Sequence, residues 1–173
     1  MEFYFPEDAI QYLQTHVHFC GKVVFLDIDD TLLTQREDSL FLIPYMHRFY
    51  KFLVAEQAKI YIITARPYSQ YNLQATTQQL RDFGYTHFEA LFLMKLATGA
   101  TVTANLIAQF KSLIRKAVRD TLGLDCVLSV GNEWHDLLLP QYIGLQLSPT
   151  KAFLFNAIDE PINYLLKLPA KAA

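Results

Sequence analysis

Hydrophobic residues form short unbroken runs along the chain, separated by longer stretches in which they recur every three or four positions. These runs are Val23–Leu26, Ile60–Ile63, Ala90–Leu93 and Cys126–Val130, the last of which is broken only by Ser129. A strand shows such continuous hydrophobicity when both faces of its sheet are covered. We therefore predict four buried strands.

The stretches between these runs have the periodicity of amphipathic helices. Pro44 suits a first helical position and precedes apolar residues on one face. A second helix is predicted from Ser69 to Phe83, ending before Gly84, and a third carries an apolar stripe from Leu106 to Val118. Alternating strands and helices predict a doubly wound, Rossmann-like α/β fold, with a parallel sheet and helices on both faces.

The length of 173 residues fits one domain, here predicted to span residues 1–173. Its core is expected over residues 20–150. The apolar stretch that starts at Ala152 and runs on to Leu166 predicts a last helix, at about residues 151–167. Beyond this core the chain has no room for a substantial cap domain, so an open site is expected.

Charge and cysteine content narrow the class of protein. Lys and Arg number 15 against 17 Asp and Glu, a balance that argues against a general nucleic-acid binder. The acidic N-terminus does not resemble a signal peptide, and no apolar run approaches the roughly 20 residues that span a bilayer. Two cysteines without metal-type spacing are typical of a reduced compartment. We therefore expect a cytoplasmic protein without a membrane segment.

Polar residues follow each predicted strand, at the edge where open α/β sheets bind ligands. They are Asp27–Thr31, Thr64–Arg66, Lys95 and Gly131–Asp136. Carboxylates gathered beside buried strands repel one another unless a cation lies between them. Oxygen ligands of this kind suit Mg²⁺, which commonly bridges to a substrate phosphate.

The spacing within the first cluster indicates a chemistry. In a strict strand Asp27 and Asp29 would point the same way. One carboxylate could attack phosphorus while the other exchanges a proton with the leaving oxygen and with water. Thr64 and a lysine could hold phosphoryl oxygens. The structural alternative is that Asp27–Thr31 only form a turn and helix caps.

Four segments, in order along the chain, resemble the motifs of the haloacid dehalogenase superfamily of phosphohydrolases. Val23–Leu33 looks like its first motif, and Ile60–Pro67 like its second. Phe110–Lys116 is similar to the lysine motif of the acid phosphatase branch, and Val130–Leu137 resembles the fourth motif of that branch. Four motifs in order are far more specific than any one of them.

The resemblance implies a Mg²⁺-dependent phosphomonoesterase with an aspartyl-phosphate intermediate. It makes Asp27 the nucleophile and Asp29 the general acid and base. Thr64, Ala65, Arg66 and Lys111 would bind the substrate phosphate, and Lys111 would also orient Asp27. The metal would be held by the Asp27 carboxylate, the Asp29 carbonyl, Asn132 and Asp136. The expected substrate is a phosphorylated small molecule.

Several alternatives stay open. The branch has an aspartate where this chain has Asn132, and the loss of one negative charge predicts weaker Mg²⁺ binding. Glu133 could compensate as an additional ligand. An impaired relative that only binds a phosphorylated ligand is therefore an alternative. Lys95 directly follows a predicted strand and competes with Lys111 for the lysine role. For Lys111 to reach the site its helix should begin near it, whereas the periodicity permits a start near Thr103. Another alternative is a solvated helix face, of which charges such as Lys111, Arg115, Lys116 and Arg119 are typical. The same basic group is the hint for a third function, a phosphatase of nucleic-acid ends. Homo-oligomerisation also stays open.

Overall fold

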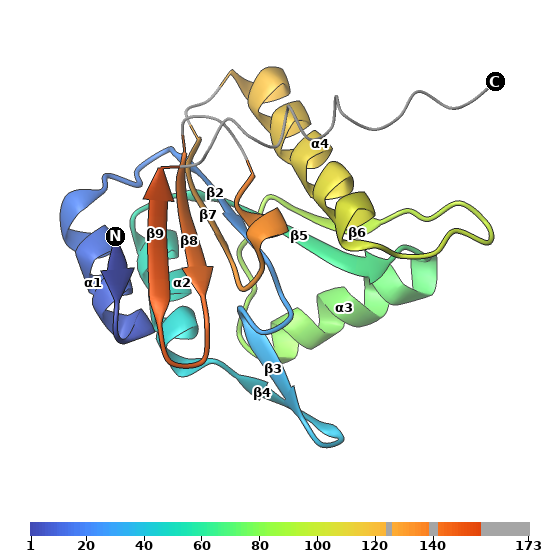
Figure 1. The fold of residues 1–173 in the computed structure, drawn as a ribbon, viewed down its shortest axis with the longest axis horizontal. Coiled ribbons are helices and arrows are strands. Elements are labelled where there is room, and N and C mark those ends of the chain that lie inside the picture. Colours follow the sequence, from blue (N-terminus) through green and yellow to red (C-terminus); the bar gives the residue numbers. More distant parts are fainter. Residues whose placement is uncertain (124–125, 139–141, 157–173) are drawn as a thin grey trace.

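The computed structural model describes residues 1–123, 126–138 and 142–156, and within them a seven-stranded sheet forms the centre of the molecule (Figure 1). The strands lie in the order β1 (Glu2–Phe3), β9 (Ala152–Asn156), β8 (Ile143–Leu147), β7 (Cys126–Gly131), β2 (Val23–Leu26), β5 (Lys59–Pro67) and β6 (Ala90–Met94). β8, β7, β2, β5 and β6 are parallel, while β9 runs antiparallel to both β8 and β1. All four strands predicted from the apolar runs are present, side by side in the parallel part.

Four helices are present in the described residues: α1 (Pro6–His16), α2 (Pro44–Ala55), α3 (Gln70–Asp82) and α4 (Ala104–Leu122). Residues at the ends of these helices satisfy or terminate the first and last turns. Pro44 occupies the first turn of α2, and the Ser69 and Thr103 hydroxyls accept hydrogen bonds from main-chain N–H groups in the first turns of α3 and α4. Gly123 ends α4 in the left-handed conformation, with φ of 57°.

Side chains of the central strands alternate between two hydrophobic cores. Val24, Leu26 and Ile62 pack with α1 and α2, and Leu80 of α3 joins the same core. Val23, Phe25 and Ile63 face the other way and pack with Val118 of α4. The sheet is thus covered on both faces, which explains the unbroken apolar runs and confirms the doubly wound α/β prediction.

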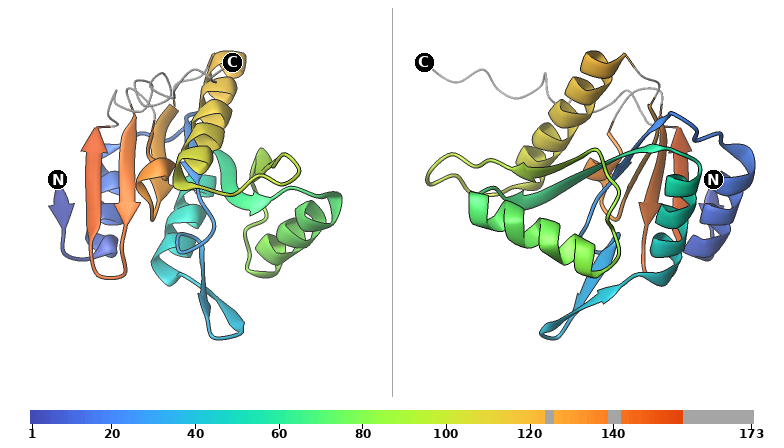
Figure 2. Two further views of the ribbon diagram at one scale, coloured as in Figure 1. Left: turned by 45° about the vertical axis from the view of Figure 1, so that its right-hand side comes forward. Right: turned by 180° about the vertical axis from the view of Figure 1, so that it is seen from behind.

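The sheet reverses its winding beside β2, whose neighbours are β5 on one side and β7 on the other. A crevice at the carboxyl ends of the strands forms at such a reversal. A two-stranded hairpin, β3 (Leu33–Arg36) and β4 (Ser39–Leu42), projects from this edge (Figures 1 and 2). This hairpin is not among the elements predicted from the sequence. In the described residues no separate cap domain is present at this edge.

The predicted C-terminal helix is wrong where the structure describes it. Residues Ala152–Asn156 form strand β9, with Ala152 and Leu154 buried and Phe153 and Phe155 stacked against each other on the opposite side. A short apolar run does not distinguish helix from strand, and pairing with β8 and β1 decided the outcome. The rest of the predicted helix, residues 157–167, lies outside the described residues.

Candidate active site

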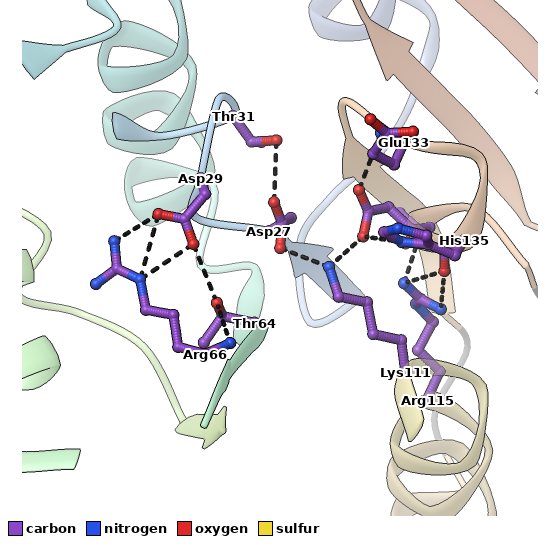
Figure 3. A network of polar contacts seen from close by, with 11 residues as sticks. Asp27, Asp29, Thr31, Thr64, Arg66, Lys111, Arg115, Glu133 and His135 are labelled. Atoms are coloured by element: carbon purple, nitrogen blue, oxygen red, sulfur yellow. Dashed lines mark hydrogen bonds and ion pairs between the residues drawn. The ribbon is translucent and has the colours of Figure 1, made fainter. Parts of the chain in front are cut away.

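Two carboxylates from neighbouring strand ends meet at one lysine (Figure 3). Lys111 of α4 donates from Nζ to Asp27 Oδ1 at 2.6 Å and also to Asp136 Oδ1. The main-chain N–H of Asp27 donates to the carbonyl of Val130 at 3.0 Å, which aligns the ends of β2 and β7. The structure therefore brings together three of the predicted site residues, all buried.

The position of Lys111 corrects two expectations. The notion that α4 must begin near Lys111 for this side chain to reach the site is wrong, because the helix begins at Ala104 and Lys111 reaches Asp27 from deeper within it. The solvated helix face is also wrong for half of its members: Lys111 and Arg115 are each only 2% exposed. Lys95, the rival lysine, is exposed to solvent.

Asp29 belongs to a second group of side chains beside the first. Arg66 donates from Nε and Nη2 to both carboxylate oxygens of Asp29, at 2.6 to 3.2 Å. Its Nη1 donates to Gln79 Oε1 of α3 at 2.6 Å. The buried hydroxyl of Thr64 lies 3.4 Å from Asp29 Oδ2, and the partly exposed Ala65 separates Thr64 from Arg66 on β5.

Asp27 and Asp29 do not point the same way, contrary to the strict-strand expectation. β2 ends at Leu26, and Asp29 already lies in the following turn. Asp27 turns toward Lys111, whereas Asp29 turns toward Arg66 (Figure 3) and its side chain is 55% exposed. One acid is therefore buried and the other is open to solvent.

Burial and pairing move the pKa values of the two buried acids in opposite directions. Burial, aided by the nearby Asp136 carboxylate and opposed by Lys111, raises the pKa of Asp27 from 3.8 to about 7. Burial also acts to raise the pKa of Asp136. There, however, the hydrogen bond from His135 and the charges of Lys111 and Arg115 outweigh it, so the pKa lies below its ordinary value.

The loop after β7 presents Asp136 from a short 3₁₀ turn, η1 (Trp134–Asp136). The main-chain N–H of Glu133 donates to Asp136 Oδ2 at 3.1 Å, and His135 Nδ1 lies 3.3 Å from Oδ1. A Cβ atom at Gly131 would overlap the Asp136 side chain, so this position requires glycine. Asn132 is partly exposed, and its main-chain carbonyl accepts a hydrogen bond from the Gln146 side chain.

The oxygen donors around Lys111 suit a hard divalent cation. Asp27 and Asp136 already direct carboxylate oxygens from two strand ends at one cationic group, the Lys111 ammonium. In the part of the chain that the structure describes, no three His, Cys, Asp or Glu side chains are placed to hold a metal ion. A metal site here would therefore draw on amide or main-chain oxygens as well, which Mg²⁺ accepts together with water.

A pocket of about 660 Å³ flanks these groups on the side of the β3–β4 hairpin. It is lined by residues of the hairpin and the start of α2, by Asp30, Asn132 and Glu133 from the two loops of the site, and by the turn between β8 and β9. Phe41, Tyr45 and Leu147 contribute apolar surface, and Arg36 a positive charge. The site is thus bordered by a space that could receive part of a ligand.

The strand order and the position of the polar cluster at the carboxyl ends of the strands are typical of doubly wound α/β proteins, which bind ligands where the winding of the sheet reverses. A family model described as HAD superfamily, subfamily IIIB (acid phosphatase), matches residues 34–155. This span exceeds half of the chain, so the chain belongs to this family of acid phosphatases. Membership implies phosphomonoester hydrolysis, and phosphatases of this superfamily typically use Mg²⁺.

No curated protein matches the chain. The matched span includes Thr64, Lys111, Asn132 and Asp136 and begins just after the first motif. No helix among the described residues is sufficiently long and apolar to cross a membrane.

Two polar residues at the site, Arg115 and Gln79, occupy places that no sequence motif indicates. The charge pattern of its helix groups Arg115 with surface residues. The available signal for Arg115 was its spacing of four residues from Lys111, which puts both on one helix face. Nothing in the sequence marked Gln79, because its contact with Arg66 joins two separate elements.

Proposed function

We propose that this chain hydrolyses phosphomonoesters through a covalent aspartyl-phosphate on Asp27. The observation that carries the proposal is the buried Asp27–Lys111–Asp136 cluster at the carboxyl ends of two adjacent parallel strands. A carboxylate in such a place is a suitable nucleophile, because the neighbouring ammonium can offset its repulsion from an incoming phosphate.

In the first step an oxygen of Asp27 attacks phosphorus, and the bond from phosphorus to the leaving oxygen breaks. Asp29 supplies the proton that the leaving oxygen needs. In the second step Asp29 takes a proton from water, whose oxygen attacks the phosphorus of the intermediate, and Asp27 is released with inorganic phosphate. The solvent exposure of Asp29 supports this role, because the attacking water can reach the carboxylate that takes its proton in the second step.

The phosphoryl oxygens would be held by Lys111 and Thr64, with Ala65 and Arg66 at the edge of the same site. Arg66 now pairs with Asp29, so it also orients the proposed acid. Mg²⁺ would be held by Asp27, the Asp29 carbonyl, Asn132 and Asp136, and when bound it would neutralise charge on the phosphate. Asn132 contributes no negative charge, which is expected to weaken the hold on the metal.

The proposed substrate is a phosphorylated small molecule whose leaving group lies in the pocket beside Asp30 and Asn132. Burial of Lys111 and Arg115 removes half of the basic group that suggested action on nucleic-acid ends. We therefore favour the small-molecule substrate over the oligonucleotide.

The test compares hydrolysis of p-nitrophenyl phosphate, with and without Mg²⁺, by the wild type and the Asp27→Asn variant. Asp82→Asn is the matched control, because it makes the same change at an exposed position on α3. We expect Mg²⁺-dependent hydrolysis by the wild type and the control, and none by Asp27→Asn. Equal rates for Asp27→Asn and the wild type would refute the role of Asp27.

A second measurement tests the covalent step. The Asp29→Asn variant should form the phosphorylated enzyme but hydrolyse it slowly. After acid quenching, mass spectrometry should therefore find one phosphoryl group on the peptide that contains Asp27. Hydrolysis by the wild type, with no phosphorylated peptide from this variant, would contradict the covalent route while leaving the phosphatase activity standing.

A further inference from the structure

We propose that Arg115 is a positioning residue: it clamps the main chain of the η1 turn so that Asp136 keeps its carboxylate aimed at Lys111 and at the metal. The proposal rests on the function proposed above, in which Asp136 is a metal ligand. It assigns to Arg115 a task different from that of Lys111, although both lie on α4.

The contacts of Arg115 are directed at the main chain rather than at a carboxylate. Its Nη2 donates to the carbonyl of Asp136 at 2.5 Å, and Nη1 and Nη2 lie 3.3 and 3.4 Å from the carbonyl of His135 (Figure 3). Two consecutive carbonyls of the turn are thereby held by one planar group. The Ser129 hydroxyl of β7 donates to the same Asp136 carbonyl at 2.5 Å.

The burial of this side chain requires an explanation. Arg115 is among the largest fully buried side chains of the described residues, and its Nε has no hydrogen-bond partner there. A buried charge is costly, and an apolar residue of similar volume could fill the same space at lower cost. The guanidinium is therefore better explained by its hydrogen bonds to the main chain of the η1 turn than by packing.

Nearby carboxylates offset the cost of burying the charge of Arg115. Burial lowers the pKa of Arg115 to about 10, and the carboxylates of Asp136 and Asp27 oppose that shift, so the group stays charged at neutral pH. Together with Lys111, it sets two cations against two buried carboxylates. Lys111 contacts the carboxylates directly, and Arg115 contacts the main chain behind one of them, a helical turn away.

Loss of Arg115 should have a different consequence from loss of Lys111. Without Arg115, the η1 turn would keep the Ser129 contact and the link from Lys111 to the Asp136 carboxylate. The fold around the turn would persist, but the orientation of the carboxylate would loosen. Groups that orient a metal ligand typically contribute about 10- to 100-fold to metal affinity, so the expected defect is in metal binding.

The experiment measures Mn²⁺ binding, by the loss of the free-ion signal in electron paramagnetic resonance, together with the Mg²⁺ dependence of p-nitrophenyl phosphate hydrolysis. The variants are Arg115→Met and Arg115→Lys, with Arg119→Met as the control. Arg119 lies one turn further along α4 and pairs with the exposed Asp120. Thermal unfolding is recorded for each variant.

We expect Arg115→Met to weaken Mn²⁺ binding and to raise the Mg²⁺ activation constant, each by about 10-fold or more. Saturating Mg²⁺ should restore much of kcat. Arg115→Lys should lie between Arg115→Met and the wild type, because a single ammonium can hold fewer carbonyl contacts than a guanidinium. Arg119→Met should bind Mn²⁺ as the wild type does.

Unchanged Mn²⁺ affinity in a folded Arg115→Met variant would overturn the proposal, as would losses of affinity in all three variants that simply follow thermal stability. If the Arg115 variants do not fold, Ser129→Ala provides the test, since it removes the other donor to the Asp136 carbonyl and should weaken Mn²⁺ binding in the same way. Failure of the proposed function has a different signature: Arg115→Met would still weaken Mn²⁺ binding, but the wild type would hydrolyse no phosphomonoester.

Discussion

Replacing Asp27 with asparagine should stabilise the metal-free protein at alkaline pH, even though it removes the proposed nucleophile. The pKa of Asp27 is raised from 3.8 to about 7, mainly by burial. Between these values the native state binds a proton that the unfolded state has released. The free energy of unfolding therefore falls as the pH rises through this window and levels off above about pH 7.

The size of the effect follows from the width of the window. It spans roughly three pH units, and each unit corresponds to about 1.4 kcal/mol. The full penalty is thus about 4 kcal/mol above pH 7, and coupling to Asp136 reduces the share that belongs to Asp27. Asparagine has nearly the same shape and no titration, so the variant should escape about 2 to 4 kcal/mol of this penalty.

The assay is urea denaturation in EDTA at pH 4 and pH 8, comparing Asp27→Asn with the wild type. The stability of the variant relative to the wild type should rise by about 2 to 4 kcal/mol between the two pH values. The control is Asp29→Asn, whose side chain is half-exposed and paired with Arg66. It should show no such gain. A stability difference for Asp27→Asn that is independent of pH would refute the reasoning that burial strains the ionised form of this acid.

Three other changes test separate parts of the structure. Lys111→Met leaves two buried carboxylates without their shared cation and should lower the free energy of unfolding, measured by urea denaturation at pH 8, by about 3 to 5 kcal/mol. The control Lys116→Met, at an exposed position, should leave it almost unchanged, and equal effects of the two changes would contradict the buried cluster. Asn132→Asp adds a carboxylate to the proposed metal site and should lower the Mg²⁺ activation constant measured with p-nitrophenyl phosphate; an unchanged constant would place Asn132 outside that site. Tyr85→Phe removes the buried hydroxyl that donates to the Leu32 carbonyl at 3.1 Å, and should lower stability by about 1 kcal/mol in thermal unfolding without changing kcat.

Much of the fold could be predicted because its signals are local. Each central strand is an unbroken apolar run, and Pro44, Ser69 and Gly123 act on the chain within one turn of their own positions. The signals for β8 and β9 were weaker, since the short apolar run of β9 fits a helix as well as a strand. β9 was predicted as a helix, and the short pattern of β8 was not recognised, because their conformation depends on pairing with each other and with β7.

The candidate site could be located in part for a geometric reason. Carboxyl ends of parallel strands meet at one edge of the sheet, so residues placed just after such strands were expected to gather there, and Asp27 and Asp136 do. The directions of the side chains could not be predicted. Asp29 turns away from Asp27 because β2 ends one residue before Asp27, and strand ends are not marked in the sequence to that precision.

The sequence by itself determined that this is a doubly wound α/β chain with acids, a threonine and a lysine at its strand ends, since the hydrophobic pattern and the motif spacing are local properties. Only the tertiary structure decided which charges are buried together. Lys111 and Arg115 look like surface residues in sequence, because a helical pattern records the face on which a residue lies but not what the opposing element offers it. Here Lys111 binds carboxylates at the ends of β2 and β7, and Arg115 binds main-chain carbonyls of the η1 turn. These partners allow both cations to be buried.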